Sequence, residues 1–211
     1  MDCICDGLYF EVSDLANDIA NKAAKHLSKK VEYVRCSDIE QYMTEVENIE
    51  FIDYNFKNNL NKVLLGSISK VQDEFIITTN KNLSDEYKNF TKMHEIIHYY
   101  RDYSYLSESH AFSDFILQKD YLPEDFDKEV AADIGASILM ANDQALKYAI
   151  NIYNNFDEIS KYFFINRNVL RTRIIQYLEF KKDLPYLVAH QKFNEYHNNK
   201  NFHLVNLFTS V

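Results

Sequence analysis

The sequence predicts an α+β fold that is mostly helical, with one small β-sheet and a separate helical unit toward the C-terminal end. Its 211 residues include only 3 Gly and 2 Pro, which favours long helices over a turn-rich β-sandwich or barrel. Apolar residues at helical spacing and two short β-branched runs support the two parts of this assignment. A hydrophobic content of 46% with 26% charged residues is typical of a globular protein.

The first expected elements are one helix and a pair of strands. Residues 12–27 carry apolar side chains at i, i+3, i+4 and i+7, which predicts an amphipathic helix packed on a core. These side chains are Val12, Leu15, Ala16, Ile19, Ala20, Ala23, Ala24 and Leu27. Residues 62–68 and 74–79 are short, β-branched-rich runs with a polar turn between them. We expect them to form a hairpin or two adjacent strands.

The second expected helix begins after Ser84, which suits the N-cap position. Asp85 and Glu86 follow in the first turn, where acidic groups complement the helix dipole. One stripe of the helix then contains Tyr87, Phe90, His94 and Ile97, with His98 beside it. The stretch KMHEIIHYYRD, residues 92–102, therefore places an H-E-x-x-H motif on a helix.

The pattern changes after this helix. Residues 102–121 are polar and are expected to be irregular, after which Pro123 suits the first position of another helix. The expected apolar stripe of that helix is Phe126, Val130, Ile134 and Ile138. Residues 156–180 predict two helices with a short polar break at Asn166–Asn168, whereas residues 181–211 are only weakly patterned.

Charge and cysteine content narrow the classes of function. A net charge of −9 and a pI of about 5.2 argue against a general attraction to nucleic acid or to an anionic membrane. Cys3, Cys5 and Cys36 form neither a CxxC pair nor an even disulfide framework, so we expect free thiols in a reducing compartment. No secretory signal and no run of about eighteen apolar residues is evident, so we expect a cytoplasmic protein without a membrane span.

The H-E-x-x-H motif has a clear chemical interpretation. Two histidines at i and i+4 project from one helical face, so His94 and His98 can reach the same tetrahedral ion. Glu95 then points to the side of the metal, where it can take a proton from a zinc-bound water. Zinc lowers the pKa of such a water toward ~7 and polarises a carbonyl. Alone, each histidine has the plainer interpretation of a surface or core residue.

A third ligand is available on the next helix. Glu129 and Asp133 are spaced i, i+4, so both carboxylates lie on one face. One of them can bind the metal while the other accepts the outer N–H of a ligating histidine. Neighbouring small residues, Ala131, Ala132, Gly135 and Ala136, would allow the two helices to approach closely. Without the first motif, the two carboxylates are more typical of a solvated helix face.

Three segments carry a resemblance to a known family. In order, EFIITTNKNLSDEYKNFTKMHEIIHYYRD, EVAADIGASILM and ISKYFFINRNVLRTRIIQYL resemble the ImmA/IrrE family of metallo-endopeptidases, over about residues 60–180. That family shows a strand ending in Asn, a Phe shortly before H-E-x-x-H, then E-x-x-A-N/D before a small-residue helix. The resemblance implies a zincin-like metallopeptidase core in residues 1–150, and a helix-turn-helix-like segment plus tail in residues 151–211.

The resemblance also implies the site residues. It assigns zinc to His94, His98 and Glu129, catalysis to Glu95, and an outer position to Asp133. The sequence departs from the family pattern where Ile97 replaces the usual Gly and where Met140-Ala141 replaces Met-Pro. Neither departure changes a ligand, but Ile97 is expected to make the helix bulkier near the site.

Members of the family often cleave a DNA-binding regulator in a bacterial cell, such as a phage or mobile-element repressor or a stress regulator. The resemblance therefore implies a regulatory zinc protease with a protein substrate. Two other classes stay open. One is a DNA-binding transcriptional regulator with a structural zinc site, and the other is a catalytically silent interaction protein.

Basic residues in the C-terminal unit bear on this choice. Residues 160–182 contain Lys161, Arg167, Arg171, Arg173, Lys181 and Lys182 against Glu179 alone. They suit either DNA contact or a surface that docks acidic or polar groups of a protein substrate. Because the chain is acidic overall, we favour protein docking by Arg167, Arg171 and Arg173 over direct nucleic-acid binding.

Overall fold

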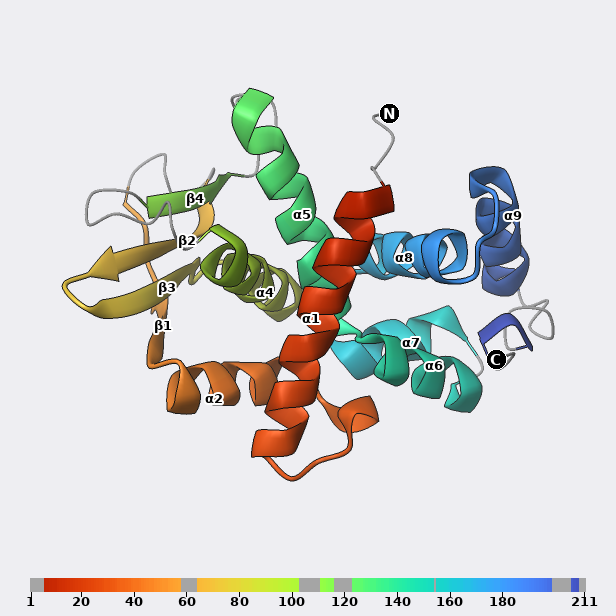
Figure 1. The fold of residues 1–211 in the computed structure, drawn as a ribbon, viewed down its shortest axis with the longest axis horizontal. Coiled ribbons are helices and arrows are strands. Elements are labelled where there is room, and N and C mark those ends of the chain that lie inside the picture. Colours follow the sequence, from red (N-terminus) through yellow and green to blue (C-terminus); the bar gives the residue numbers. More distant parts are fainter. Residues whose placement is uncertain are drawn as a thin grey trace.

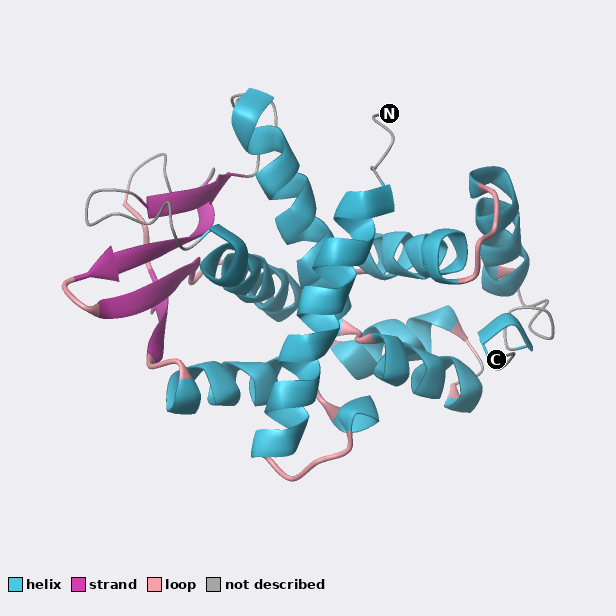
Figure 2. Ribbon diagram, in the orientation of Figure 1, coloured by secondary structure: helices cyan, strands magenta, loops and turns pink. Residues whose placement is uncertain are grey.

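A computed structural model describes residues 6–57, 64–102, 111–115, 123–153, 155–198 and 206–208. Helices make up most of the described chain and accompany a 4-stranded mixed sheet, so the predicted α+β class is confirmed. The sheet lies at one side of the molecule and the C-terminal helices at the other, with α1 (Asp6–His26) crossing between them (Figures 1 and 2). No helix in these ranges is long and apolar enough to cross a membrane.

The other elements of the described chain are as follows. The helices are α2 (Cys36–Val46), α4 (Asp85–Asp102), α5 (Pro123–Met140), α6 (Asp143–Ile152), α7 (Phe156–Phe163), α8 (Arg167–Gln176) and α9 (Tyr186–His197). Two short helical turns are η1 (Val31–Tyr33), of the 3-10 type, and η4 (Tyr177–Lys181), a π-helical turn. The strands are β1 (Ile49–Tyr54), β2 (Leu64–Val71), β3 (Glu74–Asn80) and β4 (Ala111–Phe115).

The sheet has the strand order β1-β3-β2-β4. The predicted hairpin is confirmed, because β2 and β3 pair antiparallel with Ile68 opposite Ile77. β1 pairs parallel with β3, and β4 pairs antiparallel with β2. The prediction that residues 102–121 are irregular throughout is therefore wrong at β4. That strand depends on a partner far away in the sequence, which local pattern does not reveal.

Helix α4 packs against the sheet on one side and against α5 on the other. Its approach to the sheet is close at Gly66 of β2, where an added Cβ would lie 2.3 Å from Thr91 Cγ2. On α5, Ile134 and Ile138 are buried as expected, but Phe126 is 42% exposed. The expected apolar stripe of α5 is thus wrong at Phe126.

The C-terminal unit contains the expected pair of helices. The turn between α7 and α8 begins at Phe164, which has a φ of 49°, two residues before the predicted break. Asn166 instead caps α8, because its side chain accepts a hydrogen bond from the Asn168 amide at 2.8 Å. Helix α9 lies in the segment without a clear pattern and buries Ala189 and Phe193.

The expected boundary after residue 150 falls inside α6. Buried side chains on both sides of it, from Tyr9 and Val12 to Phe193 and Phe208, belong to one hydrophobic core. The helical unit therefore packs onto the rest of the protein through α6 and α8.

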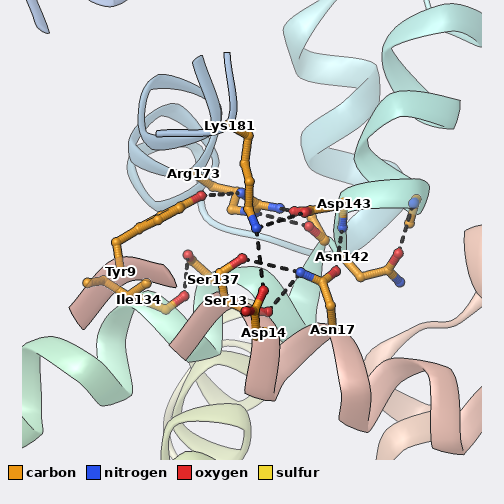
Figure 3. A network of polar contacts seen from close by, with 12 residues as sticks. Tyr9, Ser13, Asp14, Asn17, Ile134, Ser137, Asn142, Asp143, Arg173 and Lys181 are labelled. Atoms are coloured by element: carbon orange, nitrogen blue, oxygen red, sulfur yellow. Dashed lines mark hydrogen bonds and ion pairs between the residues drawn. The ribbon is translucent and has the colours of Figure 1, made fainter. Parts of the chain in front are cut away.

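A buried polar network reinforces this junction (Figure 3). The guanidinium of Arg173 is fully buried and forms an ion pair with Asp143 of α6. Its Nε donates to the Ala141 carbonyl at 3.1 Å, and Nη1 lies 3.4 Å from the Tyr9 hydroxyl. The Lys181 ammonium lies 3.8 Å from the second carboxylate oxygen of Asp143.

The assignment of Arg173 to a docking surface is therefore wrong, because its charge is enclosed and neutralised within the core. Arg167 and Arg171 do lie on the exposed face of α8. Arg167 forms an ion pair with Asp157 at 2.7 Å, and the Arg171 guanidinium lies 5.6 Å from the centre of the Phe193 ring.

Candidate metal centre

The two histidines of the motif lie on α4 with their rings turned toward one point. His94 and His98 are each 1% exposed, and their Nε2 atoms are 3.0 Å apart. The i, i+4 spacing places both rings on one side of the helix, as the sequence predicts. Packing of α4 between the sheet and α5 buries that side.

Helix α5 brings a carboxylate to the same point. Glu129 Oε2 lies 3.2 Å from His94 Nε2, and Oε1 lies 3.5 Å from His98 Nε2. One ligand atom from each of the three residues lies within 4.8 Å of the others. The structure thus brings together the three residues that the family resemblance implies as ligands.

The separations of these atoms suit a small tetrahedral cation. Zinc bonds of about 2.0–2.1 Å to nitrogen and oxygen require ligand atoms about 3.3–3.4 Å apart, the edge of a regular tetrahedron. The two histidine nitrogens are 3.0 Å apart, and each lies 3.2–3.5 Å from one of the two carboxylate oxygens of Glu129. Two neutral histidines and a carboxylate are also one of the usual ligand sets of catalytic zinc. The residues therefore fit a zinc ion.

The outer nitrogens of both rings are held by carboxylates. His94 Nδ1 lies 3.0 Å from Asp133 Oδ1, and His98 Nδ1 lies 2.8 Å from Asp102 Oδ2. Carboxylates only accept hydrogen bonds, so each neutral ring carries its proton on Nδ1 and turns the lone pair of Nε2 inward. When both rings are neutral, two lone pairs and an anionic oxygen face one another, an arrangement that a proton or a metal cation stabilises.

Asp133 has the outer position that the resemblance implies. Asp102 has the equivalent position for His98 and was not predicted. A usable signal existed, since Asp102 follows His98 by four residues on the same helix and therefore shares its face.

Electrostatics within the centre favour ionised side chains. Burial alone would raise the pKa of Glu129, but hydrogen bonds and charge from His94 and His98 lower it to about 2. Burial alone would lower the pKa of His98, yet Asp102 and Glu129 hydrogen-bond to its ring and raise that pKa above its usual value. The charge of Glu95 acts in the same direction on His98, so the Glu95 carboxylate lies within electrostatic reach of the centre.

Glu95 itself is fully buried on α4, next to His94 in the sequence. Among the described residues, the cluster of candidate ligands consists of His94, His98 and Glu129 and does not include the Glu95 carboxylate. A carboxylate in such a water-poor site interacts strongly with a neighbouring proton.

The two departures from the family pattern lie in packed regions. Ile97, expected to make the helix bulkier near the site, is fully buried and turns toward Gly135 of α5. A Cβ added to Gly135 would lie 2.5 Å from Ile97 Cγ1, so the glycine provides the space that isoleucine occupies. At the second departure, the amide of Ala141 donates to the Ser137 carbonyl at 3.2 Å, a bond that proline could not make.

No family model matches the chain, and no curated protein matches it. The ImmA/IrrE resemblance accordingly stays a prediction, and a functional assignment depends on the geometry of this centre.

Proposed function

We propose that the protein is a zinc-dependent endopeptidase. His94, His98 and Glu129 would hold the metal and Glu95 would act as the general base. The observation that carries this proposal is the convergence of two histidine nitrogens and the Glu129 carboxylate on one buried point, with one ligand atom of each residue within 4.8 Å of the others. When bound, zinc would lower the pKa of a water molecule toward ~7 and polarise the scissile carbonyl.

Each protein group has a defined task in peptide hydrolysis. Asp133 and Asp102 hold the rings of His94 and His98 with Nε2 unprotonated, so the ligands need no rearrangement. The Glu95 carboxylate takes the proton from the attacking water and passes it to the leaving amine nitrogen. Burial of Glu95 keeps bulk water from competing for that proton.

The order of elements supports a zincin-like core of the ImmA/IrrE type. A hairpin, a helix with H-E-x-x-H, a second helix with Glu129 and a helical pair follow one another as the resemblance implies. On this proposal the substrate is a regulatory protein, such as a DNA-binding repressor or stress regulator in the bacterial cytoplasm.

DNA binding is the second candidate function. The α7–α8 pair is joined by a short turn, and it leaves Arg167, Asn168 and Arg171 exposed on α8. Burial of Arg173 removes one cation from that face, and the net charge of −9 opposes approach to a duplex. Titration of labelled duplex DNA over a range of salt concentrations tests this candidate directly.

Two variants test the peptidase proposal. His94→Ala should lose the zinc that the wild type retains on purification. Glu95→Gln keeps the shape but removes the basic carboxylate. It should keep zinc and fold, and lose about 10²–10⁴-fold in cleavage rate. Elemental analysis and a peptide-cleavage assay provide the two measurements. A wild type without divalent metal would refute the centre, and a zinc protein whose Glu95→Gln variant cuts normally would refute the base.

A further inference from the structure

A pocket of about 320 Å³ lies between α4, α5 and α8, beside the candidate metal centre. Two of its lining residues also touch that centre. Asp133 holds the Nδ1 atom of His94, and the ring of Phe90 has its centre 6.2 Å from the centre of the His94 ring. A peptide whose scissile carbonyl lies at the metal would therefore pass close to this pocket.

The lining is apolar on one side and polar on the other, with Asp133 as the charged side chain that the described residues contribute to it. Phe90, Val130 and Ile134 provide the apolar wall from α4 and α5. Helix α8 contributes Asn168, Thr172 and Gln176, whose spacing of four residues places them on one face. No lysine or arginine of the described chain lines the pocket, so the lining offers no cation to an anionic group, and the Asp133 carboxylate would repel one.

Gln176 gives the pocket a specific chemical requirement. Its side chain is only 7% exposed, and within the described ranges its Oε1 atom has no hydrogen-bond donor. A buried carbonyl oxygen without a donor is unfavourable and rare in native proteins. Gln176 lines the pocket, so a ligand bound there that brings a donor up to this side chain would satisfy the oxygen.

We infer that the pocket binds a tyrosine side chain of the peptide substrate, next to the scissile bond, with the phenol hydroxyl donating to Gln176 Oε1. The inference rests on the proposed endopeptidase function. A tyrosine ring buries a large apolar area, and its hydroxyl needs a hydrogen-bond partner once buried. Phenylalanine has no donor. Asp133 could pair with the charged group of lysine or arginine, but that group would have to lose its hydration against the apolar wall, a cost that the uncharged phenol does not carry.

Paired peptides test the hydrogen bond. Zinc-loaded wild type is offered peptides that differ only by Tyr or Phe at one position near the scissile bond. Tyr should be preferred about tenfold in kcat/KM at one position, and Gln176→Leu should bring that ratio close to one. Gln41→Leu, the same substitution on the exposed face of α2, is the matched control and should keep the wild-type ratio. A wild type without the preference, or a Gln176→Leu variant that retains it, overturns the inference.

A binding measurement separates this inference from the proposed function. N-acetyltyrosinamide and N-acetylphenylalaninamide are titrated against the protein by NMR, which requires no cleavage. Tighter binding of the tyrosine compound that disappears in Gln176→Leu supports the pocket even if no peptide is cut. Peptide cleavage without any Gln176-dependent preference leaves the endopeptidase standing and refutes the pocket.

Folding of the variant is checked by thermal unfolding. Gln176→Leu removes an oxygen that lacks a donor in the free protein and should unfold at no lower temperature than the wild type. If it does not fold, Gln176→Met, with an unbranched side chain of similar length, replaces it in both assays.

Discussion

Replacement of Arg173 by methionine should destabilise the protein strongly although the residue lies far along the chain from the ligands. The change removes a fully buried charge and leaves Asp143, the Ala141 carbonyl and the Tyr9 hydroxyl without its donors. Loss of one partner of a buried ion pair costs about 3–5 kcal/mol. Because the Asp143 side chain is 20% exposed and Lys181 lies near it, we expect about 3 kcal/mol.

In a chain of this size, about 3 kcal/mol lowers Tm by about 6–12 °C. Thermal unfolding followed by circular dichroism measures the shift. Arg171→Met, two residues earlier on the exposed side of α8, is the matched control and should change stability by less than about 0.5 kcal/mol. Equal Tm values for the two variants would show that the charge of Arg173 is not enclosed, and would return it to the set of docking residues.

Three further expectations concern the metal and the surface. Glu129→Ala should weaken zinc binding more than Asp133→Ala or Asp102→Ala, each of which should cost about 10–100-fold in competition with a chelator; the reverse order would make an outer carboxylate the ligand. Because the pKa of His98 is raised, its protonation stabilises the metal-free fold at low pH, and this contribution is lost as pH rises through that pKa. The rise in Tm on adding zinc should therefore become larger between about pH 6 and 8. A rise in Tm that is the same at every pH would contradict competition between the proton and the metal. Joint replacement of Arg167 and Arg171 by alanine should raise the KM for a folded protein substrate and leave cleavage of a short peptide unchanged; equal effects on both would exclude a docking role.

The sequence predicted the elements with strong local patterns and missed those that depend on distant partners. The apolar spacing of α1 and the hairpin of β2 and β3 were visible because each pattern is complete within one segment. β4 and α9 have weak patterns of their own and are stabilised by contact with β2 and α8. Such tertiary support overrides local propensity and does not appear in a short window of sequence.

The candidate centre was predictable because its chemistry is encoded in fixed spacings on two helices. His94 and His98 at i, i+4, and Glu129 and Asp133 at i, i+4, each define one helical face. Which carboxylate approaches the rings could be assigned only through the family resemblance, since spacing alone leaves both roles open.

The error over Arg173 has a different origin. Charge suggested exposure, yet Leu170, Arg173, Ile174 and Tyr177 share the spacing of a buried stripe. This spacing predicts that Arg173 is buried. The sequence does not show that Asp143, on another helix, neutralises its charge there.

The contact between Gly135 and Ile97 has a consequence for metal selectivity. It sets how closely α5 approaches α4, and therefore how far Glu129 lies from the two histidines. A Gly135→Ala change would push the helices apart and enlarge the space between the three ligand atoms. The enlarged cavity should bind zinc less tightly and discriminate less against larger divalent ions such as Mn²⁺ or Cd²⁺. Gly135, which contributes no ligand atom, would then affect the relative affinities of the site for different divalent ions.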